Sequence, residues 1–339
     1  MTTIYRFFCK RPLIAVGTLV LMLSSFFLLS CGGGGGGGNG DGGGTSTEST
    51  SYRQTNLVSD GAVSAAYTDR NLVNPWGISF SPTGPFWVSD NGTGISTLYN
   101  GAGQPFPLSP ASPLVVTIPL PTGSPTGTRA TPTGQVFNGT SGFVIRDPAT
   151  GNSGPSRFIF ATEDGTLSGF NSDVNPTSAI LTFSNPNAVY KGLAISSNGS
   201  RLYAANFKVG AIEMFDSDFD PITSFTDPNI PSGFAPFNVQ DINGKLYVTY
   251  AKQQQPDNHD DEAGPGNGFV DVFDEDGNLL QRLVSQGNLN SPWGLALAPG
   301  NFGRFSNALL VGNFGDGRID AFDREHSHFV GFFMLGYGS

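Results

Sequence analysis

The chain has 339 residues, with 47 glycines and 24 prolines, and only 13% of its residues are charged. Many short strands joined by tight turns would give this balance, whereas long helices would require more Ala, Glu, Lys and Leu. The formal net charge of −10 disfavours phosphate backbones and anionic lipid surfaces as partners. The composition therefore predicts an all-β fold and argues against nucleic-acid binding.

The first 30 residues have the pattern of a secretory signal peptide. Three basic residues precede an apolar run over residues 13–29, and a small residue, Ser30, stands before Cys31. The four residues 28–31 (LLSC) resemble a bacterial lipobox, in which Cys31 would be acylated and would become the new N-terminus. A single transmembrane helix is the alternative, since about 17 apolar residues could just span a bilayer. The cysteine at the end of the run, followed directly by polyglycine, favours the lipoprotein signal.

Residues 31–51 are predicted to be a flexible tether, because a segment of Gly, Ser and Thr cannot bury apolar surface. The mature part keeps 14 basic and 27 acidic residues, a net charge near −13, and Cys31 is its only cysteine. Gly32 follows the cysteine, where Gram-negative sorting signals place Asp for the inner membrane. The sequence thus predicts a domain over residues 52–339 that is held at the bacterial cell envelope, at the outer membrane, by its lipid alone.

A short pattern recurs five times within residues 52–339. It consists of glycine, four residues, an aromatic residue, and then Asn or Asp, and successive copies start 71, 45, 58 and 49 residues apart. The copies begin at Gly94, Gly165, Gly210, Gly268 and Gly317, and their aromatic residues are Tyr99, Phe170, Phe215, Phe273 and Phe322.

Each copy has the same neighbours along the chain. A short apolar strand and turn-forming residues such as Asn-Gly and Asp-Gly precede the glycine, and a further strand follows the aromatic residue. A fourth strand opens upstream, as in the near copies PWGISF (75–80) and PWGLAL (292–297). Four antiparallel strands at this period are typical of a β-propeller blade, which must stack on its neighbours around an axis. The repeated aromatic residues are therefore predicted to be core residues between blades.

The Trp-Gly openings and repeated hairpins resemble six-bladed propellers of the NHL-repeat and SMP-30-like kinds. The segments QTNLVSD (54–60), NPWG (74–77) and residues 250–273 more closely resemble a family of uncharacterised bacterial secreted proteins. The resemblance implies the fold over residues 52 to about 335, without implying an activity.

One departure from that pattern concerns closure of the ring. Residues 52–58 look like the outer strand of a sixth blade, whose three inner strands should follow the fifth repeat. By the repeat period, a stretch of about 40–50 residues is missing there. We expect either a truncated product or a five-bladed ring that closes differently.

The fourth repeat carries an insertion over residues 252–266 that is dense in metal-binding side chains. Asp257, His259, Asp260, Asp261 and Glu262 lie within six residues. Carboxylates and an imidazole can hold a divalent cation, with calcium the preferred candidate. The alternative is a solvated acidic loop, which is common on protein surfaces.

A second candidate site follows from the fold. Connections that share one face of a propeller would gather residues from separate blades around the mouth of the axis. Those offering oxygen ligands are Asp90, Glu163, Asn206 and Asn313, and those predicted on the ligand face are Trp76, Lys191 and Trp293. The resemblance to SMP-30-like enzymes implies a hard cation here. The alternative is turn chemistry, because turns themselves favour Asn and Asp.

Two functions remain open from the sequence. The first is a lipid-anchored binding or scaffold module for a protein, peptide or glycan, since no catalytic triad is readable and no catalytic residue can be assigned. The second is a metal-dependent hydrolase of the lactonase or phosphoesterase type, with its site at the axis mouth.

Overall fold

The computed structural model describes residues 2–8, 18–20, 52–107 and 112–334. The predicted acylation site Cys31 and the tether lie outside these residues, as does most of the apolar run of the leader. The regular structure of the described residues is β, apart from one 3-10 turn, η1 (Gly303–Phe305). None of their helical segments has the length and hydropathy that crossing a bilayer requires.

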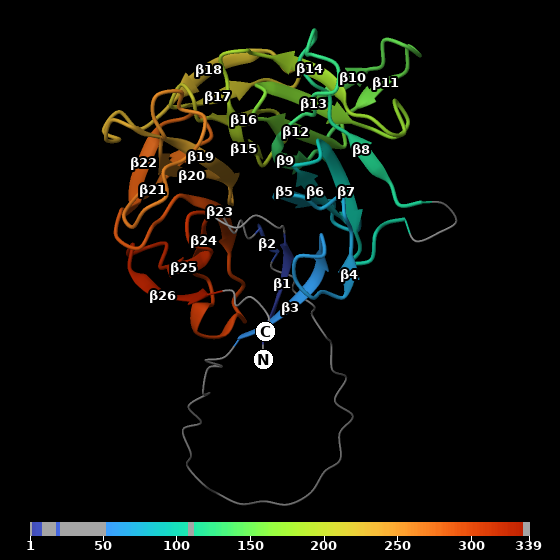
Figure 1. Cartoon of the computed structure of the whole chain (residues 1–339). Coiled ribbons are helices and arrows are strands. Elements are labelled where there is room, and N and C mark those ends of the chain that lie inside the picture. Colours follow the sequence, from blue (N-terminus) through green and yellow to red (C-terminus); the bar gives the residue numbers. More distant parts are fainter. Residues whose placement is uncertain (1, 9–17, 21–51, 108–111, 335–339) are drawn as a thin grey trace, which may run out of the picture.

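Five four-stranded antiparallel sheets surround a common axis, which confirms the predicted β-propeller of four-stranded blades (Figure 1). The first blade contains β5 (Pro75–Phe80), β6 (Phe86–Asp90), β7 (Ile95–Tyr99) and β8 (Val115–Thr117). The second contains β9 (Pro132–Phe137), β12 (Phe158–Thr162), β13 (Thr166–Phe170) and β14 (Ile180–Ser184). The third contains β15 (Tyr190–Ile195), β16 (Leu202–Asn206), β17 (Ala211–Phe215) and β18 (Pro221–Phe225). The fourth contains β19 (Phe234–Asp241), β20 (Lys245–Lys252), β21 (Gly268–Asp274) and β22 (Leu279–Ser285). The fifth contains β23 (Pro292–Leu297), β24 (Leu309–Asn313), β25 (Arg318–Phe322) and β26 (Phe329–Met334).

The repeated glycine marks the tight turn before the third strand of a blade. Four of the five copies have a positive φ, of 75°, 75°, 81° and 73° at Gly94, Gly165, Gly210 and Gly317. Residues with a Cβ rarely adopt this conformation, so glycine allows the turn between the second and third strands.

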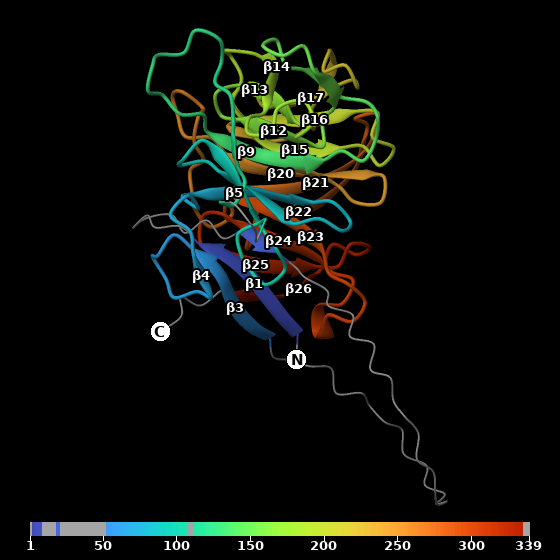
Figure 2. The ribbon, with the colours of Figure 1, turned by 90° about the vertical axis from the view of Figure 1, so that its right-hand side faces the viewer.

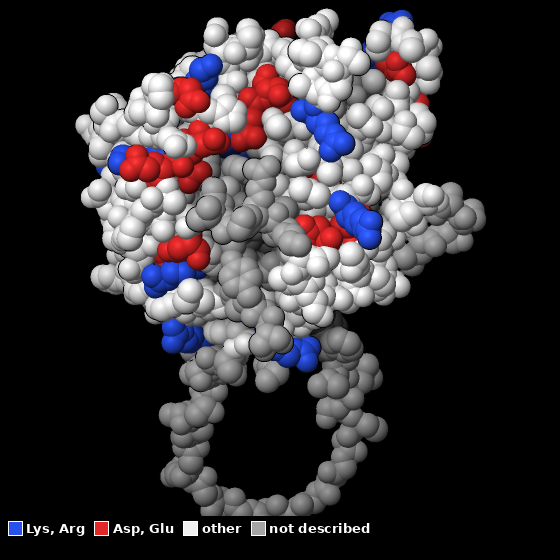
Figure 3. Space-filling view, in the orientation of Figure 1, with Lys and Arg blue, Asp and Glu red and all other residues white. Residues whose placement is uncertain are grey.

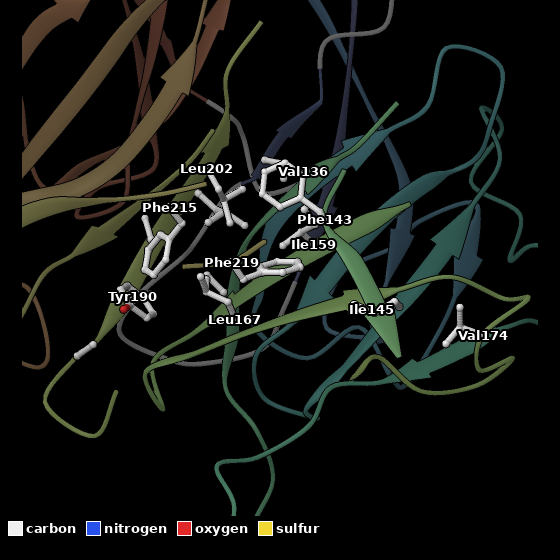
Figure 4. Packing of buried hydrophobic residues seen from close by; sticks show 14 residues of the cluster. Val136, Phe143, Ile145, Ile159, Leu167, Val174, Tyr190, Leu202, Phe215 and Phe219 are labelled. Atoms are coloured by element: carbon white, nitrogen blue, oxygen red, sulfur yellow. The ribbon is translucent and has the colours of Figure 1, made fainter. Parts of the chain in front are cut away.

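The repeated aromatic residues lie between blades, as predicted. All five are at most 3% exposed. Figure 4 shows the cluster between the second and third blades, where Ile159 and Leu167 pack with Tyr190, Leu202 and Phe215. Burial of each large apolar side chain contributes roughly 1.5–3 kcal/mol, so the interfaces between blades hold the ring together.

Glycines on the inner strands let neighbouring blades approach closely at the axis. A Cβ on Gly77 of β5 would overlap the carbonyl oxygen of Thr133 in β9, and one on Gly192 of β15 would overlap Asn238 in β19. Gly77 and Gly192 therefore let their inner strands pack directly against the next blade.

A further sheet lies between the fifth and first blades. Its order is β2 (Thr18–Val20), β1 (Thr2–Phe8), β3 (Tyr52–Ser59) and β4 (Tyr67–Thr68). Figure 2 shows β1 and β3 side by side at the lower end of the ring. β3 pairs in parallel with both β1 and β4, unlike the strands within the five blades. The predicted strand at residues 52–58 is thus present, but its partners are not three inner strands of a sixth antiparallel blade.

Two inner strands and one hairpin were not identified from the sequence. β9 and β19 open the second and fourth blades without a Trp-Gly pair. The hairpin of β10 (Val144–Arg146) and β11 (Ser153–Pro155) is inserted between β9 and β12, and Phe143 and Ile145 bury its base in the interface with the third blade.

Candidate functional site

A buried ion pair occupies the centre of the axis mouth. Lys191, near the start of β15, is only 1% exposed, and its ammonium contacts a carboxylate oxygen of Glu163 in the turn between β12 and β13. The second oxygen of Glu163 accepts a hydrogen bond of 2.8 Å from the side-chain amide of Asn91, in the first blade. The ion pair thus joins the second and third blades, and the hydrogen bond from Asn91 links it to the first.

The insertion of the fourth blade folds over this ion pair. The segment between β20 and β21 is held back by Gln253, whose side-chain amide donates 2.6 Å to the carbonyl of Phe207, and by a bridge to Asp261. This arrangement brings Asp260 to 3.6 Å from the ammonium of Lys191. His259 Nδ1 lies 3.1 Å from the same carboxylate oxygen of Asp260. His259 and Asp260 of the first candidate site therefore meet Glu163 and Lys191 of the second.

These contacts shift the ionisation of the mouth residues. The hydrogen bond from His259, together with the charge of Lys191, lowers the pKa of Asp260 to about 2. The same hydrogen bond raises the pKa of His259 above its ordinary value of 6.5, although burial and Lys191 oppose the shift. Burial raises the pKa of Asp261. Asp260 is therefore ionised at any physiological pH, and its hydrogen bond favours the protonated form of His259.

A layer of aromatic side chains closes the axis beneath the ion pair. Trp76 contacts Trp293 edge to face at 5.5 Å between centroids, and both pack with Phe237 and Phe314. The indole N–H of Trp293 donates 3.3 Å to the carbonyl of Lys191, and the ammonium of Lys191 lies 5.2 Å from the centre of the Trp76 ring. Below this layer, a small cavity of about 90 Å³ lies between the inner strands. Trp76 and Trp293, predicted on the ligand face, form the buried floor of the mouth.

Three of the predicted oxygen ligands are engaged within their own blades. Asp90, Asn206 and Asn313 each hydrogen-bond to the residue seven positions later, at 2.7–2.8 Å; those residues are Thr97, Glu213 and Asp320. Asn206 and Asn313 also accept a main-chain N–H from the segment leading into their inner strands, at Val189 and Asn290. These side chains fasten the second strand of a blade to its neighbours, and the structure does not bring them together at the axis.

Glu163, His259 and Asp260 are the described residues that could jointly hold a metal ion. Their donor atoms all lie within 4.8 Å of one another. The ammonium of Lys191 contacts two of these three side chains and supplies the positive charge that a metal ion would bring. Of the remaining acidic residues in the insertion, Glu262 pairs with Lys252 at 2.7 Å, and Asp257 is exposed.

Sequence reasoning missed Asn91 and the aromatic residues Phe207, Phe237 and Phe314. Asn91 belongs to an Asn-Gly pair, which the sequence analysis interpreted only as a turn, whereas Asn91 also donates a hydrogen bond to Glu163.

The face of the ring in Figure 3 shows red acidic side chains gathered from the centre toward the third and fourth blades.

The blades and the mouth built from all of them define a β-propeller, and the fold of one known structure agrees with this class. A chain of the nidogen/laminin complex aligns with 77% of this chain and 80% of its own, at a TM-score of 0.51 and 11% identity. Catalytically inactive virginiamycin B lyase from Staphylococcus aureus aligns over 74% of this chain and 67% of its own, at a TM-score of 0.46 and 14% identity. At these identities the likeness concerns the fold alone. No protein-family model matches the chain.

The chain belongs to the family of two proteins of Acanthamoeba polyphaga mimivirus, uncharacterized proteins R648 and L690. It is 32% identical to R648 over 284 residues, which cover 81% of this chain and 67% of R648. It is 34% identical to L690 over 279 residues, which cover 79% of this chain and 70% of L690. These relatives are viral, so the bacterial source and the lipoprotein signal expected from the sequence receive no support from them.

Proposed function

We propose that this protein is a binding module that recognises a cationic group at the mouth of the propeller axis. The β-propeller fold supports a binding or scaffold role, since it displays loops from every blade around one point. The observation that carries the proposal is the contrast between buried and exposed charges at this point. Lys191 and Glu163 neutralise each other below the surface, while the side chain of Asp260 is 64% exposed.

A ligand at the axis mouth would contact the negatively charged carboxylate of Asp260. Its low pKa keeps the carboxylate ionised, and the buried ion pair beneath it holds it in place. A ligand amine or guanidinium would form a charge-assisted hydrogen bond, which is about twice as strong as a neutral one. Partners that present such groups include proteins and peptides with exposed Lys or Arg.

Titration calorimetry with acetyl-trilysine amide as the probe tests this proposal. Asp260→Asn should weaken binding about tenfold, corresponding to ~1.4 kcal/mol. Asp257→Asn is the matched control, because Asp257 is an exposed acid of the same insertion. Equal affinities for acetyl-trilysine amide and acetyl-triglutamate amide, or equal losses in the two variants, would contradict the proposal.

We propose in addition that the protein is displayed from a membrane by a lipid on Cys31. The support is the order of residues 1–51: a basic start, an apolar run, the LLSC motif and a glycine-rich tether. Processing would remove β1, which pairs with β3 in the structure, and β2, which pairs with β1. Metabolic labelling with a palmitate analogue and intact mass measurement test this idea. An N-terminus that retains β1, or labelling that survives Cys31→Ser, would refute it.

A metal-dependent hydrolase is a second candidate, favoured by the close approach of Glu163, His259 and Asp260. A divalent ion bound there would polarise a substrate oxygen or activate water. The ammonium of Lys191 would first have to leave this cluster. Elemental analysis of the purified protein, followed by thermal shift with Ca²⁺, Mg²⁺, Mn²⁺ and Zn²⁺, distinguishes the two functions.

A further inference from the structure

A second cavity lies between the first and second blades, away from the axis mouth. Its volume is about 710 Å³, which is within the range of sites for drug-sized ligands. Its walls are mostly apolar and include Trp87, Leu98, Phe158 and Phe170. It reaches the turn between β5 and β6 and the segment after β13, at the opposite ends of the strands from the axis mouth.

The cavity exists because this interface between blades is built differently from the others. The chain between β7 and β9 is the longest insertion within the repeats, and Phe106, Pro107 and residues 112–114 of it border the cavity. Phe106 and Leu114 are joined by a main-chain hydrogen bond of 3.0 Å. On the outer side, β8 pairs with the segment at Ser178 of the second blade, through hydrogen bonds between Thr117 and residues 177–179. The insertion and the pairing of Thr117 with residues 177–179 thus border the cavity on its outer side.

Aromatic rings from both blades form the floor of the cavity. Trp87 and Phe158 stack at 4.1 Å between centroids with an angle of 20°, and Phe170 lies 5.3 Å from Trp87. These rings are at most 5% exposed, so packing holds them in place and a ligand would contact only a small part of each; Phe106, at 37% exposed, adds accessible apolar surface.

One charged side chain lines the cavity, and it is basic. Arg157 is exposed, and within the described part of the chain no ion pair includes its guanidinium. A guanidinium matches the geometry of a carboxylate, with two parallel N–H donors. The apolar walls and this one cation are complementary to an amphiphilic molecule with a negatively charged group.

We propose that this cavity binds an amphiphilic carboxylic acid, with its apolar chain or ring against Trp87 and Phe158 and its carboxylate at Arg157. This site is independent of the axis mouth. The ligand enters from the opposite face of the ring, and the acidic surface elsewhere on the molecule leaves Arg157 as the local attraction for the anion.

Titration calorimetry with decanoate, decan-1-ol and decylammonium tests the proposal. Decanoate should bind the full-length protein at one site, and Arg157→Gln should weaken this binding about tenfold. Arg146→Gln is the matched control, since Arg146 is an exposed arginine of the same blade that does not line the cavity. Thr177→Trp fills the rim from an exposed position and should abolish binding while far-UV circular dichroism stays unchanged.

Three outcomes would overturn the proposal: no saturable binding of decanoate, equal binding of decylammonium, or equal losses in the two arginine variants. Asp260→Asn should leave decanoate binding unchanged, which separates this site from the proposed function of the mouth.

Discussion

The phenol of Tyr52 donates a hydrogen bond of 2.9 Å to the main-chain carbonyl of Phe302, 250 residues further along the chain. Its ring also packs against Phe302, Phe305 and Phe333, at 5.1–5.6 Å between centroids. At the other end of β3, Val58 is fully buried in the core of the first blade. One strand therefore connects the last blade to the first.

Removal of the Tyr52 ring should weaken the closure of the propeller. We expect Tyr52→Ala to lower the free energy of unfolding by about 2–4 kcal/mol, because it leaves a cavity among three aromatic rings. Tyr52→Phe keeps the ring and should cost only ~1 kcal/mol, the contribution of one hydrogen bond. Urea denaturation measures both. Phe80→Ala, at an aromatic residue that is 54% exposed, is the control, and a loss as large as that of Tyr52→Ala would contradict the prediction.

Lys191→Met should be strongly destabilising, because it leaves the carboxylate of Glu163 buried without its cation. Breaking a buried pair on one side costs about 3–5 kcal/mol. The double variant Glu163→Gln with Lys191→Met should recover part of this loss, since no buried charge then remains unpaired. The single variants Lys191→Met and Glu163→Gln, the double variant and the native protein form a double-mutant cycle. Denaturation measures the free energy of unfolding of each. Additive losses would show that the two side chains do not act as a pair.

The pKa of His259 should show whether the insertion of the fourth blade lies over the ion pair in solution. It is raised above 6.5 chiefly by the hydrogen bond with Asp260, so Asp260→Asn should lower it, and Lys191→Met should raise it further. Protonation of His259 stabilises the folded state fully below about pH 6.5, and this contribution disappears as the pH rises through the folded pKa. Proton NMR of the imidazole measures the shift. An unchanged pKa in Asp260→Asn would show that the two side chains do not interact in solution.

Asp320 should make stability fall as the pH rises. Burial raises its pKa from 3.8 to about 6, so the unfolded chain loses this proton at a lower pH than the folded one. The folded state therefore loses stability between about pH 4 and pH 6, and the loss persists above that range. Asp320→Asn should gain about 1–2 kcal/mol relative to the native protein between pH 4 and pH 7. Thermal unfolding at both values tests this, and a constant difference would contradict it.

Gly77→Ala should be far more disruptive than Gly294→Ala, although both glycines follow a tryptophan at the start of an inner strand. A Cβ on Gly77 would overlap the carbonyl of Thr133, whereas the nearest atom to a Cβ on Gly294 is 3.5 Å away. We expect a loss of more than ~2 kcal/mol for the first and less than ~1 kcal/mol for the second. Thermal unfolding compares them, and similar melting temperatures would contradict the role of the close contact.

The sequence predicted those parts of the fold that depend on local patterns. The glycine and aromatic residue of each repeat identified the third strand, because a positive φ and a buried ring impose residue types at a fixed spacing. β9 and β19 were missed, since contacts with other blades define them more than their own residues do. The meeting of Asp260 with Lys191 could not be foreseen either, because it depends on how a loop of the fourth blade crosses the third.

The burial of the aromatic residues at the axis also depends on contacts between blades, which local sequence patterns do not reveal. The sequence placed Trp76 and Trp293 on the surface that a ligand meets, from their position at the start of an inner strand. In the structure they are 4% and 9% exposed, under Lys191. Their burial follows from Phe237, in an inner strand without a Trp-Gly pair, and from Phe314, which follows the second strand of the fifth blade.

The aromatic layer also determines whether an open channel connects the two ends of the propeller axis. Among the described residues, Trp76, Trp293, Phe237 and Phe314 form one buried cluster that fills the axis beneath Lys191. Each end can then hold its own molecule at the same time. If both proposed sites are occupied, the propeller would raise the effective concentration of one bound molecule near the other without any change in its own conformation.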